Sequence, residues 1–249
     1  MRLLPVFVLA ALLAGCAVRH PVYEAVRDGD ADRTMELVAL TGPDERITDR
    51  RVTALWLASY FRQPQVAAAL LDAGADPDAR TPAFAITPLA TTVTFREGDD
   101  EKALLDVVRL LIGRGADVNA FDVSGRTALA RAAATNRHVS RQTALKALEA
   151  LLEAGADPNY EIDVPSRRAE GGTVWLSPAF YLAYVPACAD AELLKALLAH
   201  GADPGRIAVR KDALGRETEV FALGGARLHY PKDPQGEAVR ELVESLDLP

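Results

Sequence analysis

The octapeptide LLDAGADP occupies residues 70–77, and close copies of it stand at residues 111–118, 151–158 and 197–204. In each copy a leucine-rich run ends on Gly-Ala-Asp, and successive glycines are 41, 40 and 46 residues apart. A glycine after such a run adopts the left-handed conformation that ends a helix, and a proline just beyond three of the glycines forbids its continuation. The sequence therefore predicts four helical units of one kind.

A second marker precedes each leucine-rich run. It is a Thr or Ser followed by two apolar residues: TAL at 53–55, TPL at 87–89, TAL at 127–129 and SPA at 177–179. A Thr or Ser hydroxyl can cap a helix, and proline suits the first helical position. Each unit thus consists of a short alanine-rich helix, a loop and a longer leucine-rich helix. One unit cannot bury its apolar face alone, so the units are expected to stack.

The TPL tripeptide, the recurrent LLxxGAD ending and the segment DVSGRTAL at 122–129 resemble ankyrin repeats. The resemblance covers residues 22 to about 204. It implies an all-α fold, an ankyrin-repeat α-solenoid of helix-turn-helix repeats with β-hairpin-like fingers. The family's usual period is about 33 residues. Two units here carry about seven extra residues between their helices, at 96–101 and 136–142, and one finger is lengthened across 160–172.

The chain divides into three parts by these patterns. Residues 1–15 are expected to form a lipoprotein signal peptide, 16–21 an anchor linker and 22–249 the ankyrin-repeat domain. Within that domain we expect an N-terminal cap at 22–45, four repeats at about 46–204 and a degenerate C-terminal cap at about 205–249. In the last part, apolar residues at helical spacing predict a helix over 236–246, with 218–223 as its partner helix.

The N-terminal residues indicate where the protein resides. Arg2 is followed by an apolar run from Leu3 to Leu13, too short to span a bilayer but suited to a signal peptide. The sequence LAGC at 13–16 resembles a bacterial lipoprotein signal, which implies cleavage before Cys16 and lipidation of its thiol and amino group. In such families Ala17 favours export to the periplasmic face of the outer membrane. The alternative is a soluble secretory signal with an incidental cysteine.

Charge and chemistry exclude several function classes. With 28 basic and 35 acidic residues, the net charge is −7, which disfavours nucleic acid and suits a basic protein partner. Four scattered histidines form no metal or catalytic constellation, and Cys188 is expected to be a buried, inert thiol. Asp99, Asp100 and Glu101 are interpreted as a solvated charge run, with a weak calcium site as the alternative. No enzyme activity, metal site or cofactor is predicted.

Aromatic residues recur at equivalent places in the repeats. The resemblance implies a concave groove that binds partners. The residues seven and eight positions after each capping Thr or Ser should face this groove. Large rings occupy these positions in three of the four units, and others lie on fingers, as in interface hot spots. The predicted partner-binding residues are Tyr60, Phe61, Phe84, Phe95 and Tyr184. The alternative is that some of these rings, and Trp175, pack between repeats.

These features predict an envelope-anchored protein-binding module, either an adaptor or a scaffold. The alternative function is an immunity protein or inhibitor that neutralises a secreted toxin or enzyme in the periplasm. Fold and location alone do not separate the two.

Overall fold

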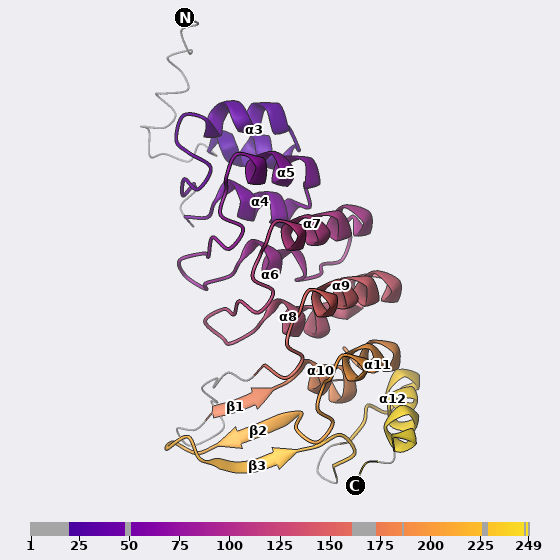
Figure 1. Ribbon diagram of the computed structural model, residues 1–249. Coiled ribbons are helices and arrows are strands. Elements are labelled where there is room, and N and C mark those ends of the chain that lie inside the picture. Colours follow the sequence, from indigo (N-terminus) through magenta and orange to yellow (C-terminus); the bar gives the residue numbers. More distant parts are fainter. Residues whose placement is uncertain are drawn as a thin grey trace, which may run out of the picture.

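The computed structural model describes residues 20–47, 51–160, 173–185, 187–225, 229–246 and 248. Helices stack in pairs along one axis, with α7, α9 and α11 on the right of Figure 1 and the connecting fingers projecting to the left. The inner helices are α2 (Pro21–Arg27), α4 (Ala54–Phe61), α6 (Pro88–Thr92), α8 (Ala128–Thr135) and α10 (Pro178–Tyr184). The outer helices are α3 (Ala31–Val38), α5 (Pro64–Asp72), α7 (Glu101–Gly113), α9 (Arg141–Glu153) and α11 (Ala191–Ala199).

The inner helices of the four repeats begin as the sequence predicts. The hydroxyl of Thr53 accepts a hydrogen bond from the backbone N–H of Trp56 at 3.2 Å. Thr87, Thr127 and Ser177 make the equivalent bond three residues along. Each bond satisfies a backbone donor that the first turn of a helix leaves unpaired. The predicted caps are confirmed.

The outer helices of the repeats end on the predicted glycines. Gly74, Gly115, Gly155 and Gly201 have φ angles between +82° and +89°, which is the left-handed region. The next residue then donates back to the helix, as Ala116 N–H does to the carbonyl of Leu111 at 3.0 Å. This arrangement satisfies a carbonyl in the last turn. The prediction of left-handed glycines is confirmed.

Leucines fill the interior between the two helix layers. The first leucine of each octapeptide copy is fully buried, and so is one leucine on each facing inner helix. Alanines such as Ala58 and Ala132 are also fully buried and let neighbouring inner helices approach closely. Helices of each layer contact those of the next repeat, so the core runs continuously along the array. The fully buried leucines are Leu55, Leu70, Leu89, Leu111, Leu129, Leu151, Leu182 and Leu197.

Polar side chains tie successive fingers together. The side-chain oxygen of Asn119 accepts the backbone N–H of Asp157 at 2.8 Å, and its amide donates to the carbonyl of Gly155 at 3.0 Å. Asn159 repeats this pattern with Asp203 and Gly201 in the next unit. These bonds join adjacent repeats and fix their spacing.

The extra residues of two repeats lengthen their outer helices. Helices α7 and α9 have 13 residues each, whereas α5 and α11 have 9. A short 3-10 helix, η1 (Asn136–His138), lies in the second insertion. Glu101 joins the two insertions, because its carboxylate accepts hydrogen bonds at 2.6 Å from the backbone and hydroxyl of Ser140 and from Thr143.

The C-terminal part departs from the predicted all-α fold. Strands β1 (Thr173–Leu176), β2 (Ala208–Lys211) and β3 (Glu217–Phe221) form an antiparallel sheet in the order β1-β2-β3 (Figure 1). The predicted helix at 218–223 is therefore wrong. The segment ETEVF at 217–221 pairs with β2 through a turn in which the Asp212 side chain accepts the backbone N–H groups of Leu214 and Arg216. Helix α12 (Pro234–Ser245) matches the other predicted helix and packs on α11.

The structure adds one finding on the membrane. No helix within the described ranges is long and apolar enough to cross a bilayer. The signal peptide, Cys16 and residues 161–172 of the long finger lie outside the described residues.

Candidate protein-binding surface

Tyr60 and Phe61 end helix α4, and their environments differ. Tyr60 is 38% exposed and stacks on Trp56 of the same helix, with ring centroids 5.4 Å apart and planes at 14°. Phe61 is half-buried and meets Tyr23 of helix α2 edge to face at 5.5 Å. Tyr60 is therefore open to a partner, whereas Phe61 joins the first repeat to the helix pair before it.

Phe95 does not occupy the predicted groove-facing position. Its side chain is 2% exposed and belongs to the hydrophobic core. The backbone N–H of Phe95 donates to the hydroxyl of Thr135 at 3.0 Å, which ties this segment to the next repeat. The expectation that the Phe95 ring faces a partner is wrong, because helix α6 ends at Thr92 and the chain turns inward after it.

Tyr184 is covered by the chain itself. It is 8% exposed, its ring stacks on that of Tyr230 at 5.1 Å, and its hydroxyl accepts the backbone N–H of Gly224 at 2.9 Å. This burial raises the pKa of the Tyr184 phenol well above its usual value. The C-terminal segment thus fills the place at Tyr184 that the sequence assigned to a partner, and the expected exposure is wrong.

Arg96 completes the exposed cluster around Tyr60. Its guanidinium lies over the Tyr60 ring, 4.1 Å from the centroid, and donates to the Tyr60 carbonyl. Asp99 holds Arg96 by accepting its backbone N–H at 2.9 Å and its Nη2 at 3.2 Å. Asp99 is itself paired with buried Arg62. Sequence reasoning missed Arg96 as part of this cluster. A signal for the two rings was present, since the spacing of Trp56 and Tyr60 by four residues places both on one helix face.

A small cavity of about 160 Å³ lies beside this cluster. It is open toward solvent and has room for one side chain, with residues from α4, α6, α8 and the finger before α6 in its walls. Arg131 of α8 also lines it and pairs with buried Asp122. We call this cavity the aromatic–arginine groove, and its lining residues are Trp56, Tyr60, Ile86, Thr91, Thr94, Arg96 and Arg131.

The fingers carry a second set of rings. Phe84 is 60% exposed, and its carbonyl accepts the backbone N–H of Val123 on the next finger at 3.1 Å. Phe121 on that finger is 40% exposed, packs on Tyr160 at 5.8 Å and lies 5.5 Å from the guanidinium of Arg80. Phe84 is therefore accessible as predicted, and Phe121 was missed because it falls outside the aligned positions.

Two further cavities are weaker candidates for a binding site. One, of about 240 Å³, lies between α8 and α10 and is lined by Arg126, Tyr160, Trp175 and Tyr181 among others. Trp175 is 5% exposed, with its indole N–H donated to the Tyr160 carbonyl at 2.5 Å, so it packs within the fold. Tyr160, one of its lining residues, directly precedes residues 161–172 in the sequence, which the structure does not describe.

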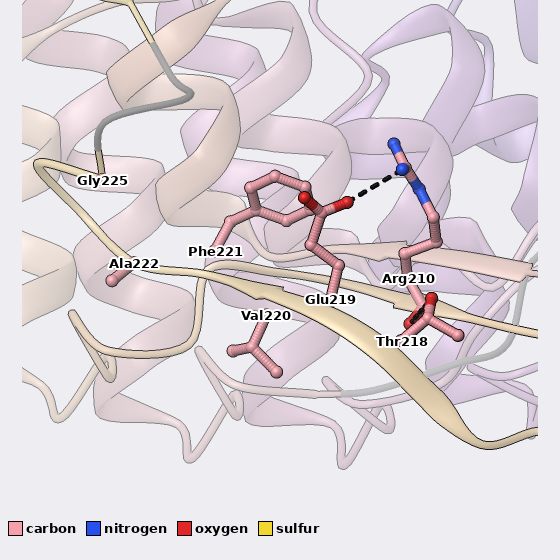
Figure 2. A pocket seen from close by; sticks show the side chains of 7 residues that line it. All are labelled: Arg210, Thr218, Glu219, Val220, Phe221, Ala222 and Gly225. Carbon is pink, nitrogen blue, oxygen red and sulfur yellow. Dashed lines mark hydrogen bonds and ion pairs between the residues drawn. The ribbon is translucent and has the colours of Figure 1, made fainter.

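The second of these cavities, about 530 Å³, lies along strand β3 (Figure 2). Arg210 and Phe221 line it, and the Arg210 guanidinium is already paired with Glu219 at 2.8 Å. Gly225, at its end, directly precedes residues 226–228, which the structure does not describe. We therefore take the aromatic–arginine groove as the best-defined candidate.

The acidic run at 99–101 serves the fold. Asp99 pairs with arginines, Asp100 caps helix α7 by accepting the N–H of Ala103, and Glu101 binds Ser140. No cluster of metal-ligating side chains occurs among the residues that the structure describes. Cys188 is buried, as predicted, and its burial raises the pKa of its thiol. The acidic run and Cys188 therefore take part in contacts within the fold.

Comparison with known proteins agrees with this geometry. Residues 51–82 match the family model described as Ankyrin repeat. The chain contains an ankyrin repeat. It is also 30% identical over 189 residues to "Ankyrin repeat and SOCS box protein 6" from Homo sapiens and from Pongo abelii. Each match covers 72% of this chain and 41% of the relative, so the chain spans less than half the length of these curated relatives.

The family match bears on function at a coarse level. The matched region, residues 51–82, includes helices α4 and α5, and the same caps and stops recur in the three helix pairs that follow. Ankyrin repeats generally mediate protein–protein interaction and are typically not enzymes, which agrees with a binding module. The stacked helices therefore present a surface suited to a partner protein.

Proposed function

We propose that this chain is an envelope-anchored protein-binding module whose partner docks on the aromatic–arginine groove. The observation that supports this proposal is the stack of half-buried Trp56, exposed Tyr60 and partly exposed Arg96. Trp, Tyr and Arg are the residues most enriched at interface hot spots, because each offers a large contact area together with a polar handle. Here the three lie together beside an open cavity, held by bonds within the fold.

The anchoring rests on the N-terminal sequence. A lipid on Cys16 would be followed by five residue steps to Pro21, where helix α2 begins. Five steps span at most about 17 Å. The repeats would therefore work close to the bilayer, in the periplasm and on the inner side of the outer membrane. Such a position suits an adaptor or scaffold that holds an envelope protein in place.

The test is capture of partners from envelope extract by the full-length chain. Proteins that bind the wild type should be lost with Tyr60→Ala and kept with Glu149→Ala, a change on outer helix α9. Loss of a true hot spot costs about 2 kcal/mol or more, which is roughly thirtyfold in affinity. Equal recovery of every captured protein by the wild type and by Tyr60→Ala would contradict the proposal.

The captured protein also decides between the two predicted functions. A secreted enzyme or toxin that loses its activity when the chain is added identifies an inhibitor or immunity protein. A partner whose activity is unchanged, but which leaves the membrane fraction when the chain is deleted, identifies a scaffold.

A further inference from the structure

The charges around the aromatic–arginine groove are arranged in two layers. Arg96 and Arg131 line the groove, and no carboxylate is among its lining residues. Their carboxylate partners lie behind them, since the side chains of Asp99 and Asp122 are only 7% and 2% exposed. The Arg96 side chain is 34% exposed. The groove therefore presents a cation to solvent although the whole chain has a net charge of −7.

The guanidinium of Arg96 is fixed in place but keeps donors that a ligand could use. Nη2 donates to Asp99 and to the Tyr60 carbonyl, while Nη1 and Nε donate to no described residue. The guanidinium carbon lies over the Tyr60 ring. An arginine fixed in this way loses little conformational freedom on binding, and its planar donors match a carboxylate.

Most of the remaining groove surface is apolar, although Thr91 and Thr94 also line it. Trp56 and Ile86 contribute its walls beside the Tyr60 ring, and the volume of about 160 Å³ accommodates one side chain. An apolar side chain placed there would stand next to whatever binds Arg96. The groove thus combines one apolar position with one anion position at adjacent points.

We propose that the groove recognises a protein segment in which an Asp or Glu stands next to an aromatic or aliphatic residue. The carboxylate binds Arg96 and the neighbouring side chain enters between Trp56 and Ile86. This inference rests on the proposed function and names the chemistry of its partner. It is opposite to the basic partner that the net charge predicts, because short-range contacts in the groove outweigh a field screened over about 8–10 Å.

The test starts from a display library of random short peptides. Peptides are selected for binding to the full-length chain in detergent. Peptides that bind the wild type but not Tyr60→Ala are ligands of the groove. Their sequences should be enriched in Asp or Glu beside Phe, Trp, Leu or Ile. Enrichment of Lys and Arg instead would overturn the acidic partner but leave the proposed function standing. Peptides that bind Tyr60→Ala as well as wild type would contradict both.

One enriched peptide is then synthesised with its carboxylate and with the matching amide. The wild type should bind the acid form about tenfold more tightly, as for a hydrogen bond to a charged group. Arg96→Gln should bind the two forms equally. The control is Arg109→Gln, which removes the same charge from an exposed place on helix α7 and should keep the preference. A preference that survives in Arg96→Gln would show that Arg96 is not the anion site.

Discussion

Nη2 of Arg62 lies 2.9 Å from Oδ2 of Asp99, and the two side chains are only 4% and 7% exposed. Arg62 follows helix α4 in the left-handed conformation, with φ of 59°, and also donates to the carbonyls of Ser59 and Thr94. This buried pair connects the end of the first repeat to the insertion of the second. The insertion in turn carries Arg96, so the ion pair positions one wall of the groove.

Asp99→Asn should destabilise the protein strongly. The change leaves the guanidinium of Arg62 buried without its counter-charge, which costs about 3 kcal/mol or more of unfolding free energy. Urea denaturation measures this cost. The control is Asp106→Asn, which breaks an exposed pair with Lys102 and should cost less than about 0.5 kcal/mol. Equal losses in the two variants would mean that the Arg62–Asp99 pair is open to water in solution.

Two neighbouring glycines should respond in opposite ways to substitution by alanine. Gly115 has φ of +82° and Gly113, the last residue of α7, does not, while an added Cβ meets no atom within 4 Å at either position. Gly115→Ala should cost about 1 kcal/mol through backbone strain, and Gly115→Val more. Gly113→Ala should stabilise the helix by about 0.5 kcal/mol. A loss near zero at Gly115 would contradict the left-handed helix end.

Stability should fall with acid partly through Glu101. Hydrogen bonds from the Ser140 and Thr143 hydroxyls and the Ser140 N–H stabilise the charged carboxylate and lower the pKa of Glu101. A lowered pKa contributes stability that is fully present above the unfolded-state value of about 4.3 and is lost as pH falls through the folded-state value. The stability difference between wild type and Glu101→Gln should thus be constant from pH 5 to 7 and shrink below about pH 4. Urea midpoints across pH measure it, and a constant difference would contradict the role of these bonds.

Local patterns predicted the repeats correctly because caps and stops depend on neighbouring residues. Thr53 reaches only to Trp56, and Gly115 ends a helix whatever lies around it. Asn119 offered no comparable local signal. Its side-chain amide bridges to the next repeat, 36 and 38 residues away. Such a bond becomes visible only when two repeats are stacked.

Three sequence predictions failed, because a contact joins residues far apart in the sequence, because a helix is shorter than the alignment assumes, or because a strand pattern was interpreted as a helix. Arg62 and Asp99 are 37 residues apart, so their pairing left no local signal, and the insertion was interpreted as solvated charge. Phe95 was assigned to the groove by alignment, but α6 has only 5 residues and the chain turns before reaching that position. The segment 217–221 alternates polar and β-branched residues, a strand pattern that was interpreted as a helix.

Cys16→Ser should release the protein from the membrane fraction or leave it uncleaved, because the thiol is the proposed lipid attachment point. Fractionation followed by mass measurement of the N-terminus distinguishes these outcomes. Cys188→Ser provides the control, since the buried Cys188 is far along the chain and should not change the fraction. A Cys16→Ser protein that is correctly cleaved and still membrane-bound would contradict the lipoprotein hypothesis.

Tyr60→Ala and Phe61→Ala should separate binding from folding, although the two residues are adjacent. Phe61 packs edge to face on Tyr23, so its removal should lower the unfolding free energy by about 2 kcal/mol. Tyr60 is exposed under Arg96, so its removal should leave stability nearly unchanged and weaken partner binding about thirtyfold. Circular dichroism in urea and titration with the captured partner measure the two effects.

The matched control for both changes is Glu149→Ala on helix α9, which should alter neither stability nor binding appreciably. Unfolding of Tyr60→Ala would show that the Trp56–Tyr60 stack belongs to the core and not to an interface. Full binding by a folded Tyr60→Ala variant would move the partner contact to the insertions at 96–101 and 136–142, which Glu101 already joins through Ser140 and Thr143. Glu101→Gln would then weaken binding more than Tyr60→Ala does.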